Sequence, residues 1–225
     1  MNWWMDPEHA KHAWDFGIAA VGALAGTAAG AWVAVQGDRK RNTKEIQDRH
    51  VEAANVAIFS LSLVYTYVVE YHLVVIQPLK DNPHRWYRIS ASVMPPPSLM
   101  PFDVGQRLAF LFESPHKNLP NRLSIEFQRF TGLLDLTRRA GEANKELQAI
   151  CAAKDPIPQD LAEIEEAIGE VRTAVLNKYV DGIIDLVEGM APSVMAAALA
   201  LRTAMLSLYP RRTIVQFAPE LLKVP

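Results

Sequence analysis

Histidines and carboxylates that could bind a metal ion occur together near the start of the chain. His9 and His12 are three positions apart in MDPEHAKH, so a helix would bring both to one face, with Asp6 and Glu8 beside them. Two imidazoles with neighbouring carboxylates could hold a divalent cation. Polar residues of this kind are also typical of a membrane interface, and we expect that role and predict no metal ligand.

A second cluster consists of acidic residues alone. EIEEAIGE brings Glu163, Glu166 and Glu170 to one side of a helix. Paired carboxylates can transfer protons, but no histidine follows them at ligand spacing, and acidic runs usually form a solvated face. The Glu-x-x-His match from Glu113 to His116 contains a proline, and we interpret it as chance.

Motifs for nucleophilic or nucleotide chemistry are absent from the sequence. It has no GxxxxGK[ST] loop, no dinucleotide-binding glycine pattern after a strand and no GxSxG. The lone Cys151 excludes an internal disulfide, and we expect it to be a small buried residue near a helix seam. We therefore predict no enzymatic activity, no catalytic residue and no cofactor. The alternative is an enzyme with a dispersed site around Glu70, His72 and the loop of Arg85.

The composition fits one domain, or a membrane anchor followed by one domain. The chain has 225 residues, of which 50% are hydrophobic, and a formal charge of −2 with a pI near 6.3. This charge balance gives no reason to expect a nucleic-acid partner. A large share of the apolar residues lies in two blocks, 16–35 and 53–76. The structure of these blocks determines where the candidate residues above are placed.

The first apolar block predicts a transmembrane helix over residues 16–36. Residues 16–35 contain no charge, and a helix of that length reaches about 30 Å, the thickness of a hydrocarbon core. The basic segment GDRKRNTK follows, so the positive-inside rule places the C-terminal side in the cytoplasm and residues 1–15 outside the cell membrane. A cleaved signal peptide is the competing interpretation. The residues expected at the membrane interface are Trp14, Trp32, Arg39, Lys40 and Arg41.

Small residues recur at every fourth position of this block. Ala19, Gly22, Gly26 and Gly30 share one face of the predicted helix, in a GxxxGxxxG pattern. Alanine and glycine contribute little to membrane insertion, but small residues allow a second helix to approach closely. We therefore expect a helix-contact face that supports a homo-oligomer or a pairing with another membrane helix. The alternative is that the pattern reflects composition alone.

The second apolar block permits two interpretations. Polar residues recur along one stripe that includes Asn55, Thr66 and Glu70, opposite apolar residues such as Leu61 and Val68. In the first interpretation this is a cytoplasmic helix, capped near Thr43, whose apolar face fills a bundle core. In the second, residues 53–76 cross the membrane again, and Glu70 is a polar membrane site.

The remaining chain predicts a helical bundle after a proline-rich connector. Residues 77–104 contain six prolines and are expected to break helix repeatedly. HRWYRI within them is expected to pack as a loop, with binding to a lipid headgroup or nucleic acid as the alternative. Asp103 is expected to cap a short helix.

Three helical segments are expected after this connector. A long helix should run to about position 153, with a coiled-coil-like seam. A third, with a seam from Leu161 through Ile168, Val171 and Val175, should reach about Glu188. Pro192 should begin or kink a further buried helix, and the C-terminal tail should lie irregularly on the bundle.

We therefore predict an all-α protein, an N-terminal transmembrane helix followed by an antiparallel bundle of long amphipathic helices over residues 37–225. The predicted function is that of a membrane-anchored interaction protein, which pairs through its membrane helix and holds or senses an unknown cytoplasmic protein partner. The alternative is a two-span hairpin of residues 16–36 and 53–76 that forms a pore or perturbs the membrane.

Overall fold

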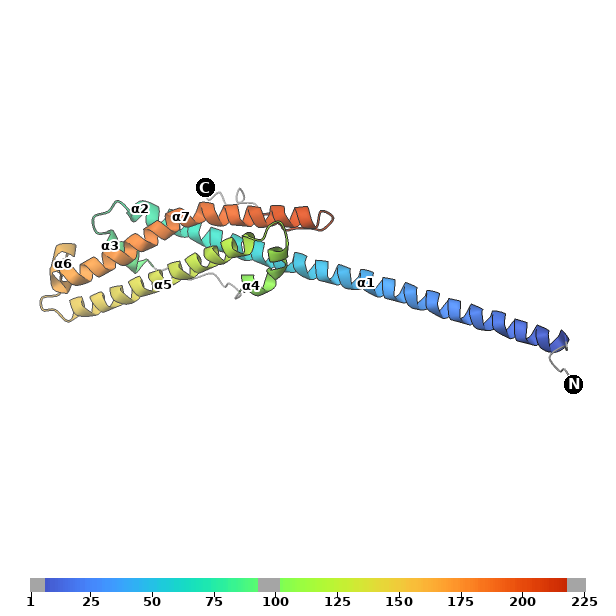
Figure 1. Ribbon diagram of the computed structural model, residues 1–225. Helices are drawn as coiled ribbons and strands as arrows, with labels where there is room; N and C mark the ends of the chain where they lie inside the picture. Colours follow the sequence, from blue (N-terminus) through green and yellow to red (C-terminus); the bar gives the residue numbers. More distant parts are fainter. Residues whose placement is uncertain (1–6, 93–101, 218–225) are drawn as a thin grey trace. The chain divides into compact units, whose positions relative to one another are not determined.

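The computed structural model describes residues 7–92 and 102–217, and the side chains of residues 7–26, 28 and 29 lie outside this description. Every regular element in the described ranges is a helix, which confirms the all-α prediction. The elements in chain order are α1 (Pro7–Tyr71), the π-helix η2 (His72–Ile76), α2 (Gln77–Leu79), α3 (Arg85–Ala91), α4 (Val104–Arg107), the 3-10 helix η3 (Ala109–Glu113), α5 (Leu119–Ala152), α6 (Leu161–Ile168) and α7 (Glu170–Leu208) (Figure 1).

The chain divides into two units, Met1–Arg49 and His50–Pro225, and α1 contributes to both. In the second unit, α5 and α7 lie side by side and run in opposite directions (Figure 1). The later part of α1 packs into the same core, where the rings of Tyr67 on α1 and Phe130 on α5 meet edge to face at 5.5 Å. A helical bundle is therefore present, as the amphipathic patterns predict.

The second apolar block contributes its apolar face to this core. Leu61, Val64 and Val68 are buried, whereas Glu70 is exposed. The polar stripe and the buried face thus lie on different sides of α1, as the spacing of the sequence indicates. Thr43 is not a helix cap, because α1 is continuous through it, and its hydroxyl donates a hydrogen bond to the carbonyl of Arg39 at 2.9 Å.

Residues 77–104 are more ordered than a proline-broken connector. The π-helix η2 ends two residues before Pro78, where a wider turn relieves the clash that a proline ring makes with a preceding carbonyl. HRWYRI does not form a loop, since most of it belongs to α3. Trp86 is only 2% exposed and packs in a second apolar cluster with Leu147 of α5, Ile168 of α6 and Leu176 of α7. Residues 93–101 lie outside the described part.

Asp103 caps α4 as predicted, because its carboxylate accepts a hydrogen bond from the backbone N–H of Gln106 at 3.0 Å. The short helix that follows is interrupted at Leu108 and continues as η3. The predicted long helix is α5. The predicted seam is buried at Leu133, Ala140 and Leu147, and only partly buried at its other members, Leu136, Ala143 and Ile150.

The third predicted helix differs from the expectation at Gly169. This residue ends α6 with a positive φ of 81°, a conformation that residues with a side chain rarely adopt. α7 begins immediately afterwards on a new rotational phase, so Val171 is 78% exposed and Val175 is also exposed, and the predicted seam is wrong at both positions. Pro192 does not begin a new helix, since α7 continues through it to Leu208.

The end of the described chain lies on the bundle, as predicted for the irregular tail. Ile214 and Phe217 are buried in the core of the second unit. Asn55 of α1 holds the tail by two hydrogen bonds, donating to the carbonyl of Thr213 at 3.3 Å and accepting from the backbone N–H of Val215 at 2.9 Å. The buried positions of α7, including Ala197 and Leu201, likewise confirm the expected buried helix.

Candidate functional site

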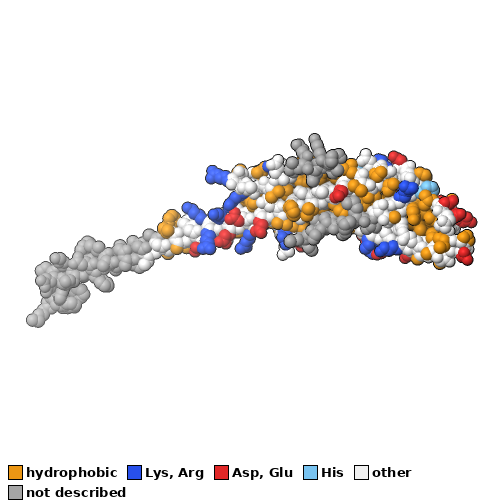
Figure 2. Space-filling model, turned by 180° about the vertical axis from the view of Figure 1, so that it is seen from behind, with side chains coloured by type: hydrophobic (Ala, Val, Ile, Leu, Met, Phe, Trp, Pro, Cys, Tyr) orange, Lys and Arg blue, Asp and Glu red, His pale blue; other side chains and the backbone are white. Residues whose placement is uncertain are grey.

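The candidate membrane-binding segment is the part of α1 between residues 30 and 44. Trp32 is 66% exposed and Val33 is 63% exposed, and Val35 is also exposed. Large apolar side chains left in water raise the free energy of a folded chain, so a run of them on one helix turn marks an interaction surface. Figure 2 shows apolar side chains followed along α1 by charged ones.

The basic residues that follow are exposed as well. Arg41 forms an i,i+4 ion pair with Glu45, with 3.0 Å between Nε and Oε1. Among the described residues, no ion pair involves Arg39, Lys40 or Lys44. Their charges are therefore available to an anionic partner, which is the arrangement expected beside a membrane anchor.

A shallow notch joins the apolar and basic parts of this segment. Its lining consists of Trp32, Val33, Gln36, Gly37 and Lys40, and its volume is about 430 Å³. No described atom lies within 4 Å of a Cβ built at Gly37. Because glycine has no side chain, Gly37 leaves space in the notch that Trp32 and Lys40 also line.

The predicted helix-contact face lies mostly outside the description. Ala19, Gly22 and Gly26 belong to α1, but their side-chain positions, like that of Trp14, are among those not described. Gly30 is described and exposed, and no described atom lies within 4 Å of a Cβ built there. The pairing of this face with another helix stays a prediction.

Two helical stretches of the described chain are long and apolar enough to cross a membrane, Gly30–Leu79 and Glu170–Leu208. In both, part of the most apolar window is buried within the protein, as in the core helices of a bundle. These stretches give weak evidence for membrane association. Most of the predicted span, residues 16–36, lies among the residues whose side chains are not described.

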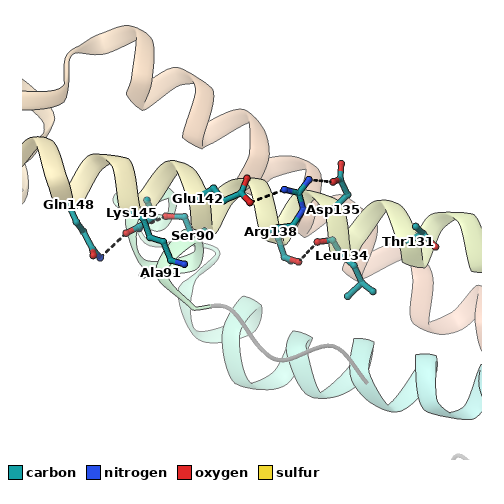
Figure 3. A pocket seen from close by; sticks show the side chains of 12 residues that line it. Ser90, Ala91, Thr131, Leu134, Asp135, Arg138, Glu142, Lys145 and Gln148 are labelled. Carbon is teal, nitrogen blue, oxygen red and sulfur yellow. Dashed lines mark hydrogen bonds and ion pairs between the residues drawn. The ribbon is translucent and has the colours of Figure 1, made fainter. Parts of the chain in front are cut away.

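A groove in the second unit lies along α5 beside the end of α3 (Figure 3). Its volume is about 740 Å³. Arg138 pairs with Asp135 at 2.7 Å and with Glu142 at 2.8 Å, and Arg138 thereby lowers the pKa of the Asp135 carboxyl below its usual value. These charges are exposed and compensate one another, so the groove offers no strong field to a charged ligand.

The floor of this groove contains a buried amide. Asn144 is 2% exposed, and its Nδ2 donates to Ser90 Oγ at 2.7 Å and to the carbonyl of Tyr87 at 3.2 Å. Its Oδ1 accepts from Gln148 Nε2 at 3.0 Å. The amide groups are thus occupied by contacts within the chain, and Asn144 acts as a tether between α3 and α5.

A second buried polar cluster joins α5 to α7. Glu126 is 5% exposed, and its Oε2 accepts a hydrogen bond from Ser193 Oγ at 2.8 Å and lies 3.4 Å from Arg129 Nη1. Arg129 also donates to Ser193 Oγ at 2.8 Å. A Cβ at Gly189 would approach Arg129 Nη2 to 3.1 Å, so the glycine leaves room for the guanidinium. This cluster is a structural contact between helices.

The histidines of the second unit make separate contacts. His50 Nδ1 lies 2.7 Å from Tyr209 Oη, and its ring stacks on Phe110. Burial lowers the pKa of His50 and raises the pKa of Tyr209, so both are neutral at pH 7. His116 Nε2 lies 3.0 Å from Ser207 Oγ. Within the described part of the chain, His72 Nδ1 is buried and has no hydrogen-bond partner.

Other residues considered for chemistry are dispersed. The side chains of His9 and His12 lie outside the description, and among described residues no group of three His, Cys, Asp or Glu side chains could hold a metal ion. Cys151 is partly buried against the second apolar cluster, close to its expected place. Glu163 accepts a hydrogen bond from the backbone N–H of Gln159, a local helix-start contact.

Sequence motifs did not predict the pairing of residues in the two buried polar clusters. Asn144 and Ser90 are 54 positions apart, and Glu126 and Ser193 are 67 apart, so their pairing arises only from the fold. A polar residue within the apolar periodicity of α5 is the one clue that could have singled out Asn144 and Glu126. Comparison of the chain with protein-family models, with curated proteins and with solved structures found no match.

Proposed function

We propose that this is a membrane-anchored interaction protein, with residues 16–36 as the anchor and the helical bundle as the part that holds or senses a protein partner. The observation that carries this proposal is the run of exposed apolar side chains at Trp32, Val33 and Val35, followed by Arg39 and Lys40, which form no ion pair with a described residue. Apolar exposure of this kind is costly in water and favourable at a membrane.

The bundle supports the second half of the proposal. Much of its apolar surface is buried in one core, although side chains such as Ile125 and Val171 are exposed, and the groove along α5 carries compensated charges and a fully used amide. Such a surface suits a protein partner better than a small reactive substrate. The absence of enzymatic activity and the identity of the partner stay predictions.

Membrane attachment is tested with the full chain. We expect the protein to stay in the membrane fraction through an alkaline carbonate wash and to require detergent for release. An arginine at the middle of the span costs about 3 kcal/mol on the insertion scale, so Leu24→Arg should shift the weakly apolar anchor towards the soluble fraction. The matched control is Val171→Arg, since Val171 is already exposed in the bundle. Wild-type protein in the aqueous fraction without detergent would refute the anchor.

Association through the small-residue face is tested at Gly30. A Cβ added there meets no described atom within 4 Å apart from its neighbours on the same helix, so the fold should tolerate a leucine, while a second helix would be kept at a distance. We expect Gly30→Leu to lower self-association of the span in a membrane two-hybrid assay. Ala31→Leu, on a different face of α1, is the control. Equal association of both variants and wild type would mean that the glycines reflect composition alone.

The two-span hairpin is the alternative that a topology experiment separates. It needs residues 53–76 in the bilayer, where the exposed Glu70 would be costly, whereas burial of Leu61 and Val68 supports the bundle. In a Cys151→Ser background, Asp81→Cys should react with an impermeant maleimide only after the cells are permeabilised. Labelling in intact cells would support the hairpin and refute a cytoplasmic bundle.

A further inference from the structure

We propose that the notch on α1 binds anionic phospholipid, with Arg39 and Lys40 recognising the headgroup phosphate. This inference rests on the proposed membrane anchor and adds the class of lipid that the anchor prefers. The observations that carry it are the notch between Trp32 and Lys40, the distribution of charge around the helix that follows, and the one ion pair within that helix.

Basic and acidic residues after the predicted span lie mostly on different faces of α1. At 100° per residue, Lys40 continues the line of Gln36 one turn later, on the side of the notch. Glu45, Asp48 and Glu52 follow Arg41 at spacings of four, three and four, which forms a separate, largely acidic face. An anion that approaches the notch side therefore meets cations first.

The basic residues after the predicted span differ in whether a carboxylate lies close to them. Arg41 is held by Glu45 at 3.0 Å and lies on the acidic face. Lys44 precedes Asp48 by four residues, so its field is reduced by a nearby carboxylate. Arg39 and Lys40 are closest to the apolar residues and form no ion pair with any described residue. They are the cations best placed for a phosphate.

The notch supplies the apolar half of a lipid site. The exposed Trp32 and Val33 line the notch from the helix turn before Gly37, and Lys40 lines it from the turn after Gly37. A phospholipid has the same sequence of groups, with acyl chains below a glycerol ester and a phosphate above. Tryptophan prefers this ester level of the bilayer. The continuity of the notch with the apolar segment favours a lipid over a soluble polyanion.

The test measures which lipid the full-length protein retains at its surface. The protein is reconstituted in phosphatidylcholine vesicles that contain a trace of spin-labelled phosphatidylglycerol or spin-labelled phosphatidylcholine. Electron paramagnetic resonance then gives the motionally restricted fraction of each label. Since one cation near an anionic headgroup contributes about a fivefold preference, we expect the restricted fraction to favour phosphatidylglycerol by about fivefold, and the preference to fall in 1 M salt.

Two double variants, which remove the same number of positive charges, separate binding at the notch from nonspecific electrostatic attraction of the basic segment to anionic lipid. Arg39→Gln with Lys40→Gln should bring the ratio of the two lipids to about 1. Arg41→Gln with Lys44→Gln removes the same charge from the acidic face and from the helix turn beyond Lys40, and should retain more than half of the preference. Equal losses in both pairs would overturn the notch as the site, as would a wild-type ratio of 1. Failure of the wild-type protein to enter phosphatidylcholine vesicles would instead overturn the membrane anchor.

Discussion

The contact between Ser193 and Glu126 gives the sharpest test of how the bundle is held together. The serine hydroxyl has one proton and two acceptors within reach, Glu126 Oε2 at 2.8 Å and the carbonyl of Met190 at 3.1 Å. The carboxylate is closer and charged, so the hydroxyl donates its hydrogen bond to Glu126 Oε2. Ser193→Ala therefore removes the shortest hydrogen bond of a buried carboxylate, whose remaining neighbour, Arg129 Nη1, is 3.4 Å away.

The expected loss follows from the burial of Glu126. A hydrogen bond to a charged group contributes about 1.5–3 kcal/mol, and with 5% exposure the carboxylate cannot recover it from water. Alanine is the better helix former by about 0.5 kcal/mol, which offsets part of the loss. Arg129 is partly exposed and can turn to solvent, so its own bond to Ser193 adds little. We expect a net decrease of about 2 kcal/mol in the free energy of unfolding at pH 7.

The measurement is urea unfolding of the full chain in mild detergent, followed by far-UV circular dichroism at pH 7. Ser62→Ala is the matched control, because the Ser62 hydroxyl donates only to the carbonyl of Ile58 four residues earlier. Removing such a local bond should change the free energy of unfolding by less than about 0.5 kcal/mol. If the two variants unfold at the same urea concentration with unchanged slopes, the Glu126 contact does not stabilise the bundle and the reasoning fails.

Three further predictions concern the turn, the tether and the surface charges of the bundle. Asn144→Ala should lower the free energy of unfolding by about 2 kcal/mol, because it leaves the hydroxyl of Ser90 without its buried partner; an unchanged urea midpoint would contradict the tether. Gly169→Ala should cost about 1–3 kcal/mol, since φ of 81° with ψ of 157° is nearly restricted to glycine, and wild-type thermal stability would show that the turn adapts freely. Arg138→Ala should raise the pKa of Asp135 in a carboxyl ¹³C NMR titration, because the guanidinium stabilises the charged carboxylate. Since the native pKa is depressed, this stabilisation of the fold is present above the ordinary carboxyl pKa and is lost as the pH falls through the depressed value. An unchanged pKa of Asp135 in the variant would refute the assignment.

The helices themselves could be predicted because their causes are local. Apolar residues at three- and four-residue spacing specify an amphipathic helix whatever it packs against, and the buried positions Leu133, Ala140 and Leu147 agree with that pattern. The cap at Asp103 depends on residues only three apart, so it was also visible in the sequence. The same local reasoning identified the weakly apolar block 16–35 and the basic residues after it.

Tertiary structure decided where one helix ends and the next begins, and which of their residues are buried. The break at Gly169 resets the rotation of α7, so Val171 and Val175 lie outside the core although their spacing continues the seam of α6. Pro192 remains within α7 because buried neighbours such as Met190 and Val194 hold the helix on both sides of it, which outweighs the lost backbone hydrogen bond.

The same holds for the polar contacts and for α3. A lone proline-rich stretch has no reason to form a helix, but Trp86 gains a fully apolar environment by docking between α5, α6 and α7, and that burial stabilises α3. Asn144 and Glu126 are polar residues within an apolar pattern, and each requires a partner more than fifty positions away. The sequence alone therefore indicated the long helices and the apolar block near the N-terminus. The short helix α3 and the pairing of buried polar groups depended on contacts that exist only once the helices are packed.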